Sequence, residues 1–292
     1  MPVPFTVRHR ASSNRGMETT PLEDLARRAI DGDRDALDQV ARQLQRDIYA
    51  LALRMLWNEA DAEDATQEIL VRIVTRLSQF DFRSRLKTWA YRVAVNHILD
   101  IKKSAIEKLH VTFERFAEDL VGGLEPSSPN ESEHSLLIDE VKVGCSLAML
   151  QCLDRPHRVA YILGEIMDFS GPEAADVLDV SAELFRKRLQ HARKTVIAFT
   201  KSHCGLVSDA APCRCNRRVS GAAAASSAEG AQPLVFARTS TSFEQARALV
   251  RRVDEARWAM EIHRTSEPRE SSVDFAQRLL DVIEPPHDAS RS

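Results

Sequence analysis

The sequence predicts an all-α protein. Apolar residues recur three or four positions apart along most of the chain, which is the spacing of one face of a helix. Glycine is scarce, with 10 residues in 292. With 43% hydrophobic and 28% charged residues, the composition is that of a globular protein, and the length suits two small helical domains with extensions.

Several classes of protein are excluded by the composition. No apolar run approaches the roughly 20 residues that span a bilayer, so we expect no membrane partner. Residues 1–20 are basic and polar without a hydrophobic region, and are expected to be a disordered N-terminus rather than a secretory signal. The five cysteines, an odd number, favour the reducing cytoplasm over a disulfide framework.

The charge is close to balanced overall but unevenly distributed. A net charge of −3 is low for a protein that binds duplex DNA unaided. Residues 59–68 nevertheless carry five acids and no base, and residues 184–201 carry six cations and no acid. This separation predicts two surfaces for two different partners.

A first helical domain is expected at residues 21–108. Pro21 suits a first helical turn, because its φ is fixed and its missing N–H is not needed there. The segment DGDRDA at 31–36 breaks this helix, and a second one continues toward Trp57. The acids after Asn58 favour the positive end of a third helix. The expected buried positions are Ile48, Leu51, Ala52, Met55, Leu56, Ile69, Ile73, Val74 and Leu77.

A basic segment, residues 83–103, reads RSRLKTWAYRVAVNHILDIKK. Its apolar positions have helical spacing, and six cations stand against a single acid. The pattern leaves open a core helix with a solvated back and a surface that binds nucleic acid. Trp89 is expected in the core by its apolar neighbours, whereas Tyr91 lies further round the helix and is expected at the surface, within reach of DNA. The other expected core positions are Leu86, Val93 and Ile101.

Residues 109–135 are expected to form an acidic, flexible linker. Residues 111–140 hold eight acids and one arginine, and the stretch VGGLEPSSPNESEHS combines glycine, proline and serine. A short helix near Phe113–Leu120 is the one regular element expected there.

The second helical domain is expected at residues 136–201. Ser170 and Glu173 have the spacing of a capping box at the start of a short helix. A tight turn follows, and Ser181 is placed to cap a second helix that carries most of the cations. Two short helices joined by a turn predict a helix-turn-helix, and cations on its second helix suit phosphates and guanine edges.

Residues 202–292 form a C-terminal extension that is expected to be partly helical, with helices at 242–263 and 273–283. Cys204, Cys213 and Cys215 lie close together in sequence. They leave three alternatives open, namely a shared metal ion, a redox-sensitive disulfide, or reduced thiols without a special role.

Three motifs in this order resemble those of the extracytoplasmic-function (group IV) sigma factors of the sigma-70 family, the small initiation subunits of bacterial RNA polymerase. DAEDATQEILVRI at 61–73 resembles the polymerase-binding helix of the family, and LKTWAYRVAVNHILD at 86–100 resembles its T-W-x-x-R segment. LDRPHRVAYILGEIMDFSGPEAADVLDVS at 153–181 resembles part of its second domain. The resemblance covers about Pro21 to Lys201.

The resemblance implies that residues 21–108 are sigma region 2 and residues 136–201 are sigma region 4, the helix-turn-helix. Such a protein binds core RNA polymerase and recognises the melted −10 and the duplex −35 elements of promoter DNA in transcription initiation. It is not an enzyme and needs no cofactor or metal. Its regulation would come from an anti-sigma factor or from the C-terminal extension itself.

The resemblance also implies roles for individual residues. Asn96 falls where the family places an asparagine that lines the pocket for a flipped −10 base, and its amide can both donate and accept. Contacts to core polymerase are implied for Asp61, Asp64, Gln67 and Glu68. Contacts to the −10 strand are implied for Arg83, Arg85, Lys87, Tyr91, Asn96, Lys102 and Lys103. Contacts to the −35 duplex are implied for Ser181, Arg186, Lys187, Arg188 and Arg193.

Two departures and one rival interpretation remain. Glu183 and its neighbours stand where many family members open the recognition helix with Gly-Thr, and Leu86 replaces a common aromatic residue. The rival is a free-standing helix-turn-helix regulator, which would need only residues 136–201. The acidic helix and the T-W segment of the first domain argue against it, since a repressor has no use for them.

Overall fold

The structure, a computed structural model, describes residues 21–101, 111–122, 135–215, 217–218, 263 and 270–283. The regular elements of this described part are all helical, and an isolated bridge between Cys204 and Cys213 is its only β-type pairing. The expectation of an all-α protein is therefore confirmed. No helix within these ranges is both long and apolar enough to cross a membrane.

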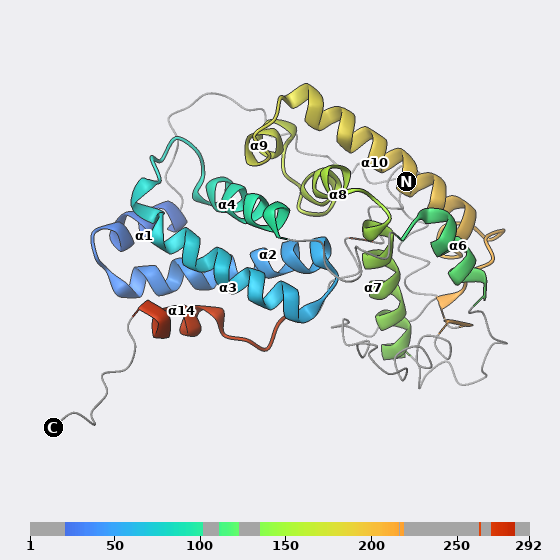
Figure 1. Ribbon diagram of the computed structural model, residues 1–292, viewed down its shortest axis with the longest axis horizontal. Helices are drawn as coiled ribbons and strands as arrows, with labels where there is room; N and C mark the ends of the chain where they lie inside the picture. The colour runs from blue at the N-terminus through green and yellow to red at the C-terminus, as the bar shows by residue number, and fades with distance from the viewer. Residues whose placement is uncertain are drawn as a thin grey trace, which may run out of the picture.

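The helices form two groups that lie side by side (Figure 1). The first group contains α1 (Pro21–Ile30), α2 (Arg34–Leu56), α3 (Glu59–Thr75), the 3-10 turn η1 (Leu77–Gln79) and α4 (Leu86–Asp100). The second group contains α6 (Phe113–Gly122), α7 (Ser135–Gln151), α8 (Arg155–Tyr161), the π-helical turn η2 (Ile162–Ile166), α9 (Gly171–Val177) and α10 (Ala182–His203). The last described helix, α14 (Phe275–Ile283), lies against the first group.

Side-chain caps separate the helices of the first group. The carboxylate of Asp33 accepts a hydrogen bond from the Ala36 amide (3.0 Å) at the start of α2, and Asn58 caps α3 in the same way. Trp57 ends α2 in the left-handed conformation, with φ 48°. The expected apolar stripes of α2 and α3 are buried as predicted, except that Val74 is only partly buried.

In the second group, the predicted capping box between Ser170 and Glu173 is present at the start of α9. Asp179 makes the tight turn with φ 51°, and the Ser181 hydroxyl then accepts from the Leu184 amide to begin α10. The helix-turn-helix is therefore α9, this turn and α10. Gly164 allows η2 to approach α10 closely, because a Cβ there would lie 2.8 Å from Leu189 Cδ2.

The acidic segment between the two groups is partly a packed element. The helix expected near Phe113–Leu120 is α6, and its Phe116 and Leu120 are 7% and 4% exposed. The Phe116 ring stacks on Phe199 of α10, with the centroids 5.4 Å apart. Residues 113–122 are therefore attached to the second group rather than acting as a spacer.

One continuous apolar core joins the two groups. The Tyr91 ring of α4 meets the Phe169 ring edge-on at 4.9 Å. Arg158 of α8 is 3% exposed, and its guanidinium donates to the carbonyl of Met55 at the end of α2 (2.6 Å). Arg155 donates to the carbonyl of Leu99 (3.0 Å) at the end of α4. Cations at these two positions suit the negative ends of the helix dipoles.

The C-terminal extension contacts both groups. The helix α14 confirms the one expected at 273–283, whereas the helix expected at 242–263 lies outside the described residues apart from His263. The ring of His263 is 2% exposed and meets the Tyr161 ring of α8 edge-on at 5.3 Å. Burial, and to a lesser extent the Arg54 charge, lower the pKa of His263 from 6.5 to about 3.

Acid is expected to destabilise the protein through His263. Below pH 6.5 the unfolded chain binds a proton that the folded chain excludes, so stability falls as the pH drops from 6.5 toward 3, by about 1.4 kcal/mol per unit. Between pH 7 and pH 5 this amounts to about 2 kcal/mol. Urea unfolding of wild type and His263→Phe at both pH values tests this, because phenylalanine keeps the ring and removes the titration. Equal pH dependence in the two proteins would contradict it.

Candidate nucleic-acid interface

An open cavity of about 580 Å³ lies on the face where α3, η1 and α4 meet. Three arginines, an indole ring, an asparagine and a glutamine gather around it. The lining residues are Arg72, Arg76, Gln79, Trp89, Arg92, Val93, Asn96, His97, Leu99 and Asp100. Guanidinium groups can hold phosphates, an amide can read the edge of a base, and an indole offers a stacking surface, so this cavity has the chemistry of a single-strand binding site.

Asn96 is exposed and is one of the residues that line this cavity. One wall is held in place by aromatic packing. The Phe80 ring lies 4.5 Å from Phe82 and 5.6 Å from Trp89, and the guanidinium of Arg27 lies over Phe82 at 4.4 Å. Trp89 is half-buried, so it contributes to the core as expected and also lines the cavity.

Tyr91 does not reach this surface, and the expectation that it is exposed is wrong. It is 1% exposed, and burial raises the pKa of its hydroxyl well above 10. The reason is the contact with Phe169 of the second group. This group covers the side of α4 that the helical pattern predicts to be exposed to solvent. Tyr91 is therefore a core residue that joins the two groups.

The predicted −10 cations before and within α4 lie outside the cavity lining, and some of them are already paired. Arg83, Arg85 and Lys87 are exposed. Arg83 pairs with Asp81 at 3.2 Å and Lys87 with Asp47 at 2.6 Å. Exposed pairs of this kind are weak and can exchange for phosphates. Lys102 and Lys103 lie outside the described residues.

Arg92 connects the cavity to the helix-turn-helix. Its guanidinium donates to the backbone carbonyl of Asp176 in α9 (2.9 and 2.7 Å) and also pairs with the Asp176 carboxylate. The short helix α9 thus packs against α4 beside the cavity. In this arrangement one of the three cavity arginines is neutralised from within the chain.

The acidic face of α3 adjoins the same cavity. Asp61, Asp64 and Glu68 are exposed, and the carboxylate of Glu68 lies 3.4 Å from the ring of His97. Burial, followed by the Arg72 charge, lowers the pKa of His97, so that its ring is neutral at pH 7. The three exposed carboxylates form an acidic surface suited to a basic partner.

Gln67, the fourth residue predicted for this face, is different. Both of its amide atoms are shielded from solvent, and the described part of the chain offers them no hydrogen-bond partner. Buried polar groups normally have a partner, so this amide is left in an unfavourable state. Gln67 is not presented to a partner in this structure.

The predicted −35 residues lie on α10, with unequal availability. Arg186 and Lys187 are exposed, Arg188 is half-buried, and Lys187 pairs with Glu183 at 2.7 Å. This pairing offsets the charge of the carboxylate that departs from the usual family pattern. The further residue Arg193 donates to Glu165, whose side chain is buried in η2, from Nε at 2.9 Å. Arg193 thus stabilises the fold, because the buried carboxylate of Glu165 needs a charged partner.

The cysteines are free and lie in apolar surroundings. Cys204 and Cys213 face each other across the isolated bridge, and burial raises the pKa of Cys213 to about 11. Burial likewise raises the pKa of Cys145 and of Cys152 to about 12. Thiols held protonated react slowly with oxidants. Among the described residues no group of three or more His, Cys, Asp or Glu side chains could hold a metal ion. Cys204, Cys213 and Cys215 thus lie in one apolar cluster together with Cys145.

The family model described as Sigma-70 region 2 matches residues 40–105. The chain is 27% identical over 180 residues to the RNA polymerase sigma factor NccH of Alcaligenes xylosoxydans xylosoxydans, covering 62% of this chain and 95% of that protein. It is 24% identical over 177 residues to the ECF RNA polymerase sigma factor SigW of Bacillus subtilis, covering 56% and 89%. The solved complex of CnrH with the cytosolic domain of CnrY matches at 23% identity and a TM-score of 0.43, covering 60% and 94%. The region 2 match contains α3 and α4, and with them both the acidic face and all of the residues that line the cavity.

Proposed function

We propose that the chain is an extracytoplasmic-function sigma factor of the sigma-70 family, which directs promoter-specific initiation by RNA polymerase; the match to Sigma-70 region 2 and the similarity to two named sigma factors support this. Residues 21–108 act as region 2 and residues 136–201 as region 4. The observation that carries the proposal is the position of the acidic face of α3 directly beside the cavity that contains Asn96. An initiation factor needs one surface that binds the polymerase and another that binds the opened DNA strand, and α3 and α4 offer the two side by side.

Core polymerase is the partner assigned to the acidic face. Asp61, Asp64 and Glu68 project from one side of α3 and offer three negative charges to a basic helix. The cavity then receives a base of the opened −10 strand. Its arginines neutralise the backbone, and Asn96 reads the base edge, because unpaired bases expose both their faces and their edges.

The −35 duplex is assigned to α10, whose exposed Arg186 and Lys187 provide phosphate and base contacts. The −10 and −35 elements are about 25 base pairs apart, which is about 85 Å at 3.4 Å per pair. In the structure α9 packs against α4, so the two DNA-binding surfaces belong to one compact body. Engaging both elements therefore requires the contact of Arg92 with Asp176 to open.

The protein has no catalytic step of its own in this proposal, because phosphodiester formation belongs to the polymerase. Its place of action is the cytoplasm, where free and protonated thiols persist.

Run-off transcription tests the proposed function. Core polymerase with the purified chain is used to select promoters from a library of duplex fragments, and the selected templates are then transcribed with and without the chain. We expect initiation at one defined position only when the chain is present. Duplex binding by the chain alone, without initiation, would instead identify a free-standing helix-turn-helix regulator.

Replacing Asn96 by alanine tests the cavity itself. We expect the preference for one −10 base to relax about tenfold, since a good amide contact to a base is worth about 1–3 kcal/mol, while binding to core polymerase is unchanged. Initiation rates on templates carrying each of the four bases at that position measure the effect. The control is Gln39→Ala on the exposed side of α2. Unaltered base preference would refute the assignment of Asn96.

A further inference from the structure

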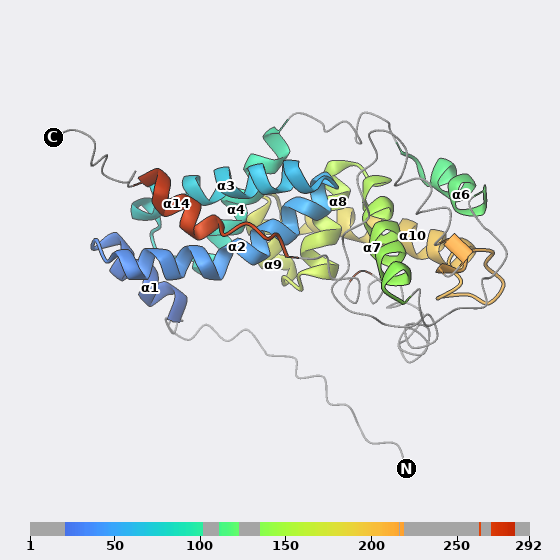
Figure 2. The same cartoon turned by 90° about the horizontal axis from the view of Figure 1, so that it is seen from below.

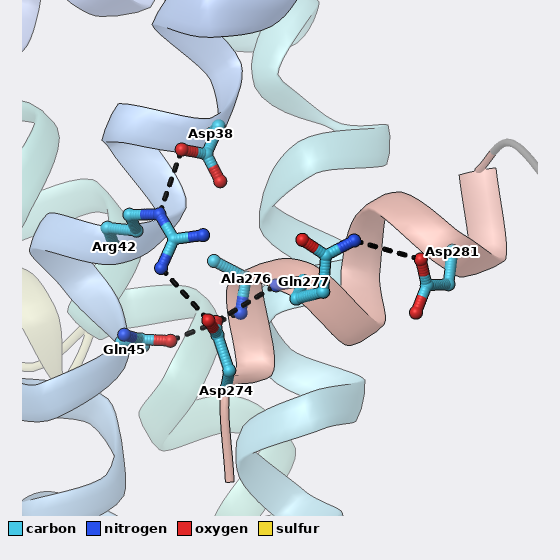
Figure 3. Close-up of polar contacts among 7 residues, drawn as sticks. All are labelled: Asp38, Arg42, Gln45, Asp274, Ala276, Gln277 and Asp281. Atoms are coloured by element: carbon cyan, nitrogen blue, oxygen red, sulfur yellow. Dashed lines mark hydrogen bonds and ion pairs between the residues drawn. The ribbon is translucent and has the colours of Figure 1, made fainter.

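The segment at residues 270–283 is attached to region 2 by polar contacts at its N-terminal end (Figure 3). Arg42 of α2 lies between two carboxylates, Asp38 at 2.8 Å and Asp274 at 3.0 Å. Gln45, also on α2, accepts a hydrogen bond from the Ala276 amide at 3.1 Å. The Ala276 amide lies in the first turn of α14, where backbone N–H groups have no hydrogen-bond partner within their own helix. The first turn of α14 is therefore completed partly by α2, while Asp274 accepts a hydrogen bond from the Gln277 amide at 3.0 Å.

Apolar packing continues along the helix. Phe275 is 3% exposed and Leu279 is 1% exposed, and the Phe275 ring lies 5.9 Å from the Tyr49 ring of α2. A helix of nine residues is too short to be stable in water by itself. The helical state of α14 therefore depends on its docking to α2 and α3, which Figures 1 and 2 show from two sides.

The docked segment occupies the flank of the predicted polymerase-binding face. The hydroxyl of Ser271 donates to the carboxylate of Glu63 on α3. Gln67 lies one turn further along the same side of the helix, and its amide is the one withdrawn from solvent without a partner. A partner that binds Asp64, Glu68 and the Gln67 amide would clash with residues 270–283, which lie against α3.

We propose that residues 270–283 are a cis-acting latch that competes with core polymerase for the α2–α3 face. The inference rests on the proposed function, because it names the regulation of the same surface. When the latch is docked, the Gln67 side of α3 is covered, and when it is released, the polymerase gains access. The Gln67 amide, which has no hydrogen-bond partner while the latch is docked, then becomes available to the polymerase.

The contacts of the latch suit a reversible closure. The ion pairs of Arg42 with Asp274 and of Arg46 with Glu270 (3.1 Å) are exposed, and such pairs are individually weak. On the outer side of α14, Val282 remains 64% exposed. If about one molecule in ten is open at any time, the apparent affinity for polymerase falls about tenfold relative to a latch-free chain.

Two variants of the full chain separate the latch from the rest of α14. Leu279→Glu places a carboxylate in the buried contact and should release the helix. Val282→Glu makes the same chemical change on its exposed side and should leave it docked. Hydrogen exchange of residues 270–283 reports release, and titration with labelled core polymerase reports affinity. We expect Leu279→Glu to bind core polymerase about tenfold more tightly than wild type, and Val282→Glu to match wild type.

A charge exchange provides the second variant, in case Leu279→Glu damages the fold. Asp274→Arg should also release the latch and tighten binding, and combining it with Arg42→Asp should restore part of the docking and return the affinity toward that of wild type. Release of the segment without tighter binding would overturn the proposal, and weaker binding would show that α14 assists the polymerase. If none of the proteins, wild type included, bound core polymerase, the proposed function would fail instead.

Discussion

Replacing Asp64 and Glu68 together by lysine is expected to weaken binding to core RNA polymerase about a hundredfold. The two carboxylates stand one turn apart on the exposed side of α3, and the side chain of Glu68 is 63% exposed. Close charge pairs between proteins contribute about 1.5–7 kcal/mol, and reversing both charges adds repulsion from the same basic partner. A loss of about 3 kcal/mol corresponds to the hundredfold change in dissociation constant.

The control for this experiment is the double replacement of Asp31 and Asp35 by lysine. These carboxylates are also exposed and four positions apart, and they lie at the turn between α1 and α2, away from the predicted contact. The net charge changes by the same amount in both double variants. Titration with labelled core polymerase at two salt concentrations measures the effect, and the loss should be larger at low salt because exposed charges are screened.

Equal losses in the two double variants would mean that only the net charge matters, and an unchanged affinity in the Asp64 and Glu68 variant would remove α3 from the interface. Both variants should unfold at nearly the wild-type temperature, since neither pair is buried. This keeps a loss of binding separate from a loss of folding.

Local signals in the sequence predicted most of the helices. The Ser170 and Glu173 capping box, the break at residues 31–36 and the helical periodicity of α2 and α3 act within a few residues of one another. For such features the sequence contains the necessary information. The packing of α6 was not predicted, because an acidic segment reads as a solvated linker until its few apolar residues find a partner in α10.

The candidate site was predicted only in part, for a similar reason. Asn96 was identified within α4, whereas Arg72 in α3 and Arg76 directly after it, which complete the cavity, were not. Their spacing of four residues on the polar side of α3 was the available signal. Tyr91 was misplaced because a periodic pattern identifies one buried face, and here a second group covers another face through Phe169. The docking site of α14 was equally hidden, since amphipathicity predicts a helix but not its partner.

Replacing Arg158 by methionine is expected to lower the free energy of unfolding by about 4 kcal/mol, because several buried carbonyls lose a charged donor. The guanidinium donates to Met55 (2.6 Å) at the end of α2. It also donates to Gln151 (3.3 Å) and Leu153 (2.9 Å) at the end of α7. Two helix C-termini therefore meet at one cation, which their dipoles favour. Methionine fills a similar volume but donates no hydrogen bond.

The expected fall in melting temperature is on the order of 10 °C for a chain of this size. Arg158→Lys should lower the melting temperature less than Arg158→Met, because an ammonium keeps the positive charge. It should still be less stable than wild type, because an ammonium lacks the planar guanidinium that donates to three carbonyls. Arg186→Met is the control, since Arg186 is exposed on α10 and its removal should leave the melting temperature near that of wild type.

The shape of the unfolding curve tests what Arg158 joins. Because this residue connects α2 in the first group with α7 and α8 in the second, its loss should weaken the coupling between them, and a single transition in urea should broaden or divide into two. A destabilised variant that still unfolds in one sharp transition would mean that the shared apolar core, through Tyr91 and Phe169, suffices to couple the groups. A melting temperature equal to that of wild type would show that the buried carbonyls do not depend on this cation.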